Sequence, residues 1–208
     1  TGLLWASLRD PTNALQASTK QHLSIIWSVL KQKLKEAKAQ KGKALSAQEL
    51  HDNDKVKANA VGVLATVTEH QDTRIRILHC FMNPISLLLE LLDPAVENQG
   101  PAGASTRKRA EVEAGPCKEV IANTCACIGN ITKPIKEEFS DEIDSSIVAV
   151  MSEQKVVQLL VKLCHTDHDI VRKQVAYAVA QVVRFHHNRQ AFAELGGIVP
   201  LVSFLRSV

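Results

Sequence analysis

The sequence predicts an all-α protein made of stacked amphipathic helices, and three observations support this prediction. Apolar residues recur at three- and four-residue spacing through most of the chain. Hydrophobic residues make up 45% of the sequence and aromatic residues only 4%, a balance that suits packed helices better than a β-sandwich. The apolar run that ends at Leu163 recurs in a run that ends at Leu205. That separation, 205 − 163 = 42 residues, indicates a repeated helical unit.

Residues 1–53 are expected to form a partial repeat with a basic helix and linker. The segment DPTN (10–13) combines turn residues with a helix-capping residue. Apolar residues then recur at helical spacing from Leu15 to Leu30. The segment that follows contains six lysines and one glutamate, so we expect this helix to end in a highly basic tail.

A first complete repeat is expected over residues 54–93. It is preceded by Ser46 and Glu49, which have the three-residue spacing of a capping box. The repeat contains one helix with a clear apolar face, a short second helix, a proline and a leucine-rich helix. Residues 94–116 then contain three prolines and three glycines. This composition cannot bury a core, so we expect an exposed insertion there.

Two further repeats are expected over residues 117–168 and 169–208, the second of them truncated. The first of these holds an acidic insertion, FSDEIDSS, at residues 139–146. The second contains the pair Gly196-Gly197, and glycine tolerates the left-handed geometry that ends many helices.

The leucine-rich helices are expected to be the most buried parts of the fold. They lie at residues 85–92, 156–163 and 198–205, and each carries apolar residues on the face that a neighbouring helix would cover.

The segment NRQAFAELGGIVPLVSFL (188–205) resembles the junction between armadillo repeats, in which a glycine pair precedes a helix of the form I-x-P-L-V-x-x-L. The 42-residue separation lies within the period of about 40–47 residues of armadillo and HEAT repeats. The resemblance implies an armadillo/HEAT-type right-handed α-solenoid. Because both ends of the sequence look like elements cut part-way, we expect the chain to be a piece of a longer array.

Three segments narrow the resemblance within the armadillo family. GLLWASLRDPTNALQAS (2–18), CACIGNITK (125–133) and RFHHNRQAFAELGGIVPLVSFLRS (184–207) are similar to repeats of the armadillo-type subunits of outer dynein arm docking complexes. This resemblance implies a non-catalytic scaffold that helps dock outer-arm dynein onto axonemal doublet microtubules. The implied partners are other docking-complex subunits, outer-arm dynein and tubulin, in the cytoplasm and the axoneme of a cilium or flagellum. The alternative is a peptide-binding adaptor with an importin- or catenin-like groove.

Asn130 is the first candidate partner-binding residue. It matches the asparagine that peptide-binding armadillo proteins project into their concave groove, where it bonds the backbone of an extended ligand. The family pattern has tryptophan four residues earlier, and here that position is Ala126. The corresponding positions in the flanking repeats are Thr66 and Gln181. The alternative is a structural asparagine near a helix end.

Lys31, Lys33, Lys35 and Lys38 form the second candidate set. The segment 31–43 has a local charge of 6 − 1 = +5, compared with +3 for the whole chain. Such a segment would attract an acidic partner such as a tubulin tail, an RNA or another subunit; the alternative is a solvated helix face. The same two interpretations apply to Arg107-Lys108-Arg109, which resembles a minimal nuclear-import signal or forms a solubilising patch.

The sequence predicts no enzyme activity, no cofactor and no metal. It contains no nucleophile-elbow, phosphate-loop or H-E-x-x-H motif. The five cysteines are odd in number and irregularly spaced, which favours reduced thiols in an intracellular compartment. Cys164, His165 and His168 have ligand-like spacing but lack an evident fourth ligand. A net charge of +3 does not by itself indicate nucleic acid, and no apolar run reaches the roughly 18–20 residues of a membrane span.

Overall fold

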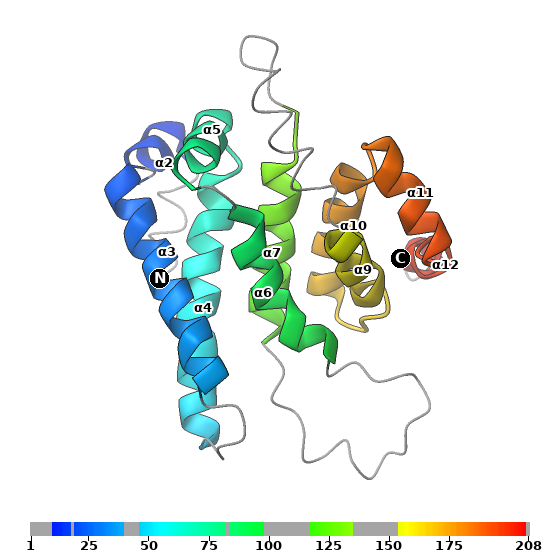
Figure 1. Cartoon of the computed structure of the whole chain (residues 1–208), viewed down its shortest axis with the longest axis horizontal. Coiled ribbons are helices and arrows are strands. Elements are labelled where there is room, and N and C mark those ends of the chain that lie inside the picture. Colours follow the sequence, from blue (N-terminus) through cyan, green and yellow to red (C-terminus); the bar gives the residue numbers. More distant parts are fainter. Residues whose placement is uncertain are drawn as a thin grey trace.

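A computed structural model of the chain describes residues 10–17, 19–39, 46–81, 84–97, 117–134 and 154–206. Within these ranges every regular element is an α-helix and none is a strand, which confirms the all-α class. In chain order the helices are α2 (Pro11–Ala17), α3 (Lys20–Ala39), α4 (Ala47–Val67), α5 (Gln71–Cys80), α6 (Pro84–Glu97), α7 (Lys118–Ile131), α9 (Gln154–Leu163), α10 (Asp169–Val182), α11 (His186–Glu194) and α12 (Ile198–Arg206) (Figure 1).

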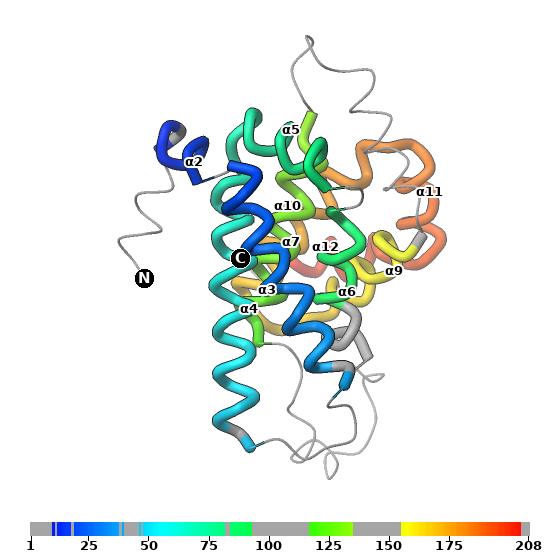
Figure 2. Tube along the Cα trace, turned by 60° about the vertical axis from the view of Figure 1, so that its left-hand side comes forward, coloured from blue at the N-terminus to red at the C-terminus, as the bar shows by residue number. Residues whose placement is uncertain are grey.

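The helices lie in rows, and the tube view shows the same arrangement from a second direction (Figure 2). One row consists of α4, α7 and α10, in which α7 packs between the other two. A second row consists of α3, α6 and α9, and α2 packs against α5. Neighbouring helices within a row are three apart in the helix numbering of Figure 1.

The start of α4 confirms the capping box that the sequence predicts. The Ser46 hydroxyl accepts a hydrogen bond from the Glu49 amide at 3.2 Å, and the Glu49 carboxylate accepts one from the Ser46 amide at 2.9 Å. These bonds satisfy donors that lack partners within the helix. The helix that we expected from residue 54 therefore begins at Ala47 and continues unbroken to Val67.

The end of α11 confirms the role of the glycine pair. Gly196 has φ = 76°, the left-handed region in which glycine is favoured. The amide of Gly197 donates to the Phe192 carbonyl at 2.9 Å, and the amide of Gly196 donates to the Ala193 carbonyl at 3.0 Å. A side chain on Gly197 would meet the Phe192 ring at 2.5 Å. The first glycine is therefore needed for its backbone geometry and the second for space.

The boundary between α6 and the insertion differs from the prediction. The helix continues through Glu97, so residues 94–97 are helical and only residues 98–116 remain of the expected insertion, outside the described residues. α6 thus continues past Pro94, although a proline beyond the first turn of a helix removes one backbone hydrogen bond and crowds the preceding turn. The acidic insertion at 139–146 also lies outside the described residues.

No single described helix is long and apolar enough to cross a membrane. The pair Gln71–Cys80 and Pro84–Leu92 passes a length and composition test only when taken together, and it is bent by 94°.

Burial follows the prediction in two of the three leucine-rich helices. In α6 and α9 the apolar residues form the centre of the core; they are Ile85, Leu87, Leu88, Leu89, Leu91 and Leu92, and Val156, Val157, Leu159, Leu160, Val161 and Leu163. The prediction is wrong for α12, where Ile198 is 54% exposed, Val199 77% and Val202 41%. The sequence pattern of α12 is that of a core helix, but no described element covers this face.

Candidate partner-binding surface

A polar seam joins α7 to α4. Three α7 side chains donate to successive backbone carbonyls of α4: Asn123 to Ala58 at 3.1 Å, Cys127 to Val61 at 3.6 Å and Asn130 to Ala65 at 2.9 Å. The donors are four and three residues apart, so they share one face of α7. Because donors and acceptors advance in the same direction, α4 and α7 run parallel. The seam fixes the register between these two helices.

Asn130 lies at the end of this seam and is only 4% exposed. Besides its bond to the Ala65 carbonyl, its Nδ2 donates to the Thr68 hydroxyl at 3.3 Å. Its Oδ1 accepts from the Tyr177 hydroxyl of α10 at 2.7 Å. Ala65 is one of the last four residues of α4, whose carbonyls lack partners within the helix. Asn130 therefore caps α4 from the next helix and links α4, α7 and α10.

The sequence left two roles open for Asn130, binding a ligand or a structural role near a helix end, and the structure uses both groups of its side chain within the fold. Of the two corresponding positions, Thr66 is buried and its hydroxyl donates to the Gly62 carbonyl at 3.1 Å. Gln181 is half-buried. The structure therefore places no row of free amides along α4, α7 and α10.

Close contact between α7 and α10 depends on Gly129. A Cβ atom at this position would lie 2.5 Å from the Tyr177 ring and 3.3 Å from the Ala178 Cα. The Lys133 ammonium lies 5.3 Å from the centroid of the same ring, within cation–π range. Tyr177 is therefore held by Gly129 beneath it, by Asn130 at its hydroxyl and by Lys133 over its face.

The turns that follow α4 and α10 are capped in the same way. The Thr73 hydroxyl donates to the Val67 carbonyl, and the Asn188 amide donates to the Val182 carbonyl at 3.2 Å. In both turns the donor residue lies six positions after the acceptor residue. The second donor and acceptor each lie 115 residues after the first pair. The two turns are thus closed by the same kind of cap.

The arginines that follow these two donors act alike. Arg74 donates to the Thr68 and Glu69 carbonyls at 3.4 and 3.0 Å, and Arg189 donates to the Arg184 carbonyl at 3.2 Å. Arg74 is 4% exposed, and this burial lowers its pKa. Sequence reasoning missed these caps, although the two pairs Thr73-Arg74 and Asn188-Arg189 were a visible signal.

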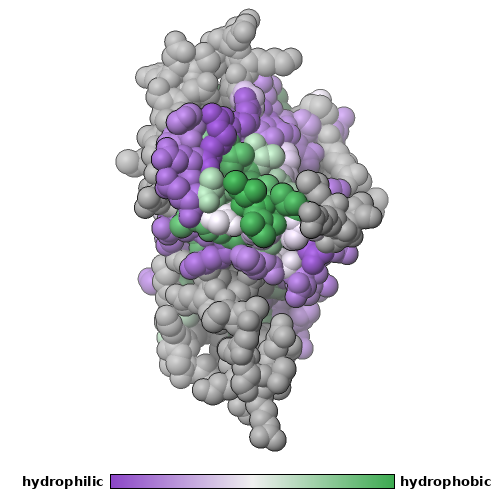
Figure 3. Space-filling model, turned by 90° about the vertical axis from the view of Figure 1, so that its right-hand side faces the viewer, coloured by the Kyte–Doolittle hydropathy of each residue, from purple (hydrophilic) through white to green (hydrophobic). Residues whose placement is uncertain are grey.

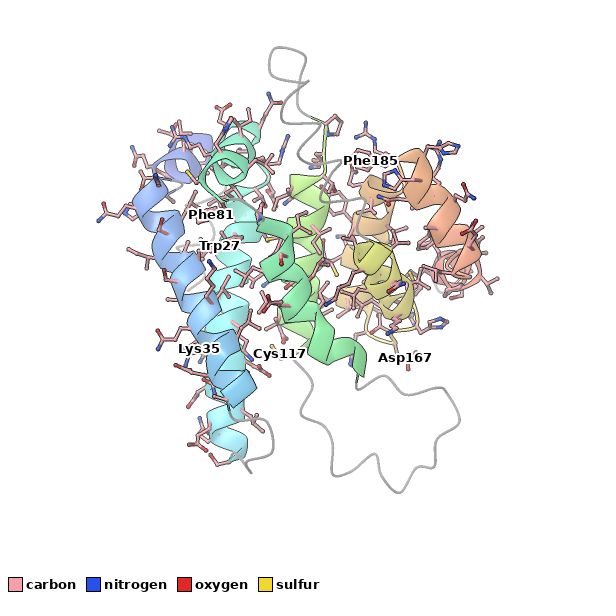
Figure 4. The ribbon with its side chains drawn as sticks, viewed as in Figure 1. Trp27, Lys35, Phe81, Cys117, Asp167 and Phe185 are labelled. Atoms are coloured by element: carbon pink, nitrogen blue, oxygen red, sulfur yellow. The ribbon has the colours of Figure 1, made fainter. Side chains whose placement is uncertain are left out.

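The candidate lysines whose side chains the structure describes differ in their surroundings. Lys33 pairs with the Glu36 carboxylate at 2.8 Å and donates to the Asn53 side chain of α4 at 2.9 Å. The bond from Lys33 is the largest cause of the lowered pKa of Glu36. Lys31 and Lys35 are exposed, and Figure 4 labels Lys35 on the outer side of α3. The side chain of Lys38 lies outside the described residues.

Burial disfavours the reactive thiolate form of the three buried cysteines. Burial raises the pKa of Cys125 and Cys127 well above the ordinary value and that of Cys164 to about 12. Cys80 and Cys117 are half-buried and free. Over the part of the chain that the structure describes, no three His, Cys, Asp or Glu side chains converge on a position that could hold a metal, and Cys164, His165 and His168 do not form such a group.

The chain matches no family model, no curated protein and no solved structure.

Proposed function

We propose that the chain is a non-catalytic scaffold built as an armadillo/HEAT-type right-handed α-solenoid. The observation that carries the proposal is the row packing of α4, α7 and α10, in which each helix contacts the equivalent helix of the next unit. Stacked units of this kind present long continuous surfaces and need no catalytic centre. The seam and the caps described above support it further, because they join neighbouring units through backbone carbonyls.

The same contacts support a particular repeat register. The proposed units are α2–α3–α4, α5–α6–α7, a third unit that ends in α9 and α10, and a fourth that begins with α11 and α12. The equivalent caps at Thr73 and Asn188 then both lie at the start of a unit. This register differs from the boundaries expected from sequence, because each long helix closes a unit instead of opening one.

We further propose that this scaffold helps dock outer-arm dynein onto axonemal doublet microtubules, with other docking-complex subunits as partners. The sequence similarity of residues 2–18, 125–133 and 184–207 carries this step. The groove-type peptide adaptor is less favoured, because Asn130 is buried and its amide is used between helices.

The test is co-sedimentation of the purified chain with axonemal doublets, with and without docking-complex subunits. Saturable binding that requires the other subunits is the expected result. A variant with Lys31 and Lys35 changed to Gln is compared with a control carrying the same change at Lys162 and Lys173, which are also exposed. Binding to singlet microtubules and doublets alike, unaffected by the subunits, would refute the docking proposal.

A further inference from the structure

The side of α3 that faces away from α4 carries positive charge without a partner. Lys33 reaches across to the Asn53 side chain, which marks the direction of α4. Two residues along a helix turn the side chain by about 200°, so Lys31 and Lys35 project from the opposite side. Both are exposed, and within the described part of the chain neither ammonium group has an ion-pair or hydrogen-bond partner. Lys31 and Lys35 are called the lysine flank below.

The nearest carboxylate does not neutralise the lysine flank. Glu36 is the one acidic residue of the segment 31–43. Its Oε2 lies 2.8 Å from the Lys33 Nζ, and its Oε1 accepts a hydrogen bond from Gln32 at 2.9 Å. The helix dipole does not account for these charges either, because it acts within about the last turn. Lys31 lies 39 − 31 = 8 residues before the end of α3 at Ala39.

The other end of the molecule has a different surface. There Leu195, Ile198, Val199 and Val202 form an exposed apolar area over α11 and α12 (Figure 3). An apolar face of this kind suits the packing of another amphipathic helix. The same packing over the lysine flank would bury two ammonium groups without counter-charges, which is costly. Whatever binds the lysine flank must therefore bring anionic groups.

We propose that the lysine flank binds an extended, glutamate-rich segment of a partner polypeptide. Lys31 and Lys35 are four residues apart, which is a rise of about 6 Å along the helix. Alternate side chains of an extended chain lie on one side, about 6.6–6.8 Å apart, so two alternate glutamates can reach both lysines. Self-repulsion keeps a glutamate-rich chain extended. This inference rests on the scaffold function proposed above and deepens it by naming the chemistry of one partner.

A nucleic acid fits the lysine flank less well. Residues 19–43 contain no arginine, the side chain whose planar group binds two phosphate oxygens at once. Proteins that bind single strands also stack bases on aromatic side chains. In α3 the indole ring of Trp27 is only 5% exposed, and it stacks on the Phe81 ring with centroids 4.4 Å apart. The lysine flank therefore offers charge without a stacking surface.

The probe is a fluorescent peptide of about ten glutamates, and its binding to the full chain is followed by fluorescence anisotropy at about 50 mM salt. Saturable binding is the expected result. Changing both Lys31 and Lys35 to Gln should weaken it by about fivefold to tenfold, the scale of two exposed ion pairs. Raising the salt to about 0.5 M should weaken binding to the native chain by at least as much, because exposed charges are then screened.

Three controls make the result specific. A chain with Lys162→Gln and Lys173→Gln loses the same net charge from two exposed lysines on α9 and α10, and its binding should change by less than about twofold. A chain with Lys31→Arg and Lys35→Arg keeps both charges and should bind like the native chain. A peptide of the same length made of glutamine should not bind.

Three results would overturn the proposal. They are no saturable binding of the glutamate peptide, equal weakening by the Lys162→Gln, Lys173→Gln control, and tighter binding of a single-stranded uridine RNA with the same dependence on the lysine flank. The last result would make a nucleic acid the partner.

None of these measurements uses axonemes, so the two proposals fail separately. A chain that binds doublets together with the docking-complex subunits but does not bind the glutamate peptide would refute this inference alone. Peptide binding that depends on the lysine flank, in a chain that does not bind doublets, would refute the docking function alone.

Discussion

Replacing Asn130 by Ala should destabilise the protein by about 2–4 kcal/mol. The change removes the bonds to the Ala65 carbonyl at 2.9 Å and from the Tyr177 hydroxyl at 2.7 Å. A typical bond contributes about 0.5–1.5 kcal/mol net, and a buried group left without a partner costs about 1–3 kcal/mol. The Ala65 carbonyl keeps its bond from the Thr68 hydroxyl at 3.0 Å, so the loss is partial on that side.

A double-mutant cycle with Tyr177→Phe separates the two bonds. Removing the hydroxyl alone should cost about 1 kcal/mol, and the double variant should be more stable than the sum of the single changes predicts by a similar amount. The assay is urea unfolding followed by circular dichroism. Gln181→Ala is the matched control, since it lies at the equivalent position of α10 and is half-buried, and it should change stability by less than about 0.5 kcal/mol.

An Asn130 that pointed into a groove would behave differently. Its replacement would then change stability by less than about 0.5 kcal/mol, as surface substitutions do, and Tyr177→Phe would be additive with it. That pair of results would refute the capping role and return Asn130 to the candidate ligand-binding residues.

The remaining predictions concern packing and ionisation. Gly129→Ala should destabilise by about 1–3 kcal/mol in urea unfolding, because the new Cβ would overlap the Tyr177 ring; no loss would mean that α7 and α10 are further apart. Leu160→Ala should cost about 2–5 kcal/mol, and Leu201→Ala less, because Leu201 is only half-buried; equal losses would place a covering element on α12. Burial raises the pKa of Cys125 and Cys127 above the ordinary 9.0. Their contribution to stability is therefore full below pH 9 and falls as the pH rises further, because only the unfolded thiols then ionise. A flat stability profile above pH 9 in reductant, compared with a Cys125→Ala, Cys127→Ala variant, would contradict their burial.

Local features of the fold were predictable because short segments determine them. The Ser46 capping box and the Gly196-Gly197 turn depend on bonds within six residues, and both are found as expected. The extension of α6 to Glu97 was missed because prolines and glycines dominate the composition of the segment that follows.

Burial and pairing were harder to predict, because they depend on neighbours distant in sequence. The pattern of α12 matches that of α9, yet exposure differs because α9 has α10 beside it. Lys33 finds Asn53, 20 residues away, and Asn130 finds Tyr177, 47 residues away. Nothing in the spacing of either residue indicates those partners, which join α3 to α4 and α7 to α10.

The parallel packing of the long helices explains why cations gather where they end. Parallel helices place their partially negative C-terminal ends at the same edge, and cations near those ends are stabilising. Arg74 and Arg189 bond carbonyls of the turns after α4 and α10, and Lys133 follows the end of α7. An acidic partner approaching this edge would have to compete with those carbonyls. The positive charges at the ends of α4, α7 and α10 therefore stabilise the fold. The exposed Lys31 and Lys35 are better candidates for binding an acidic partner.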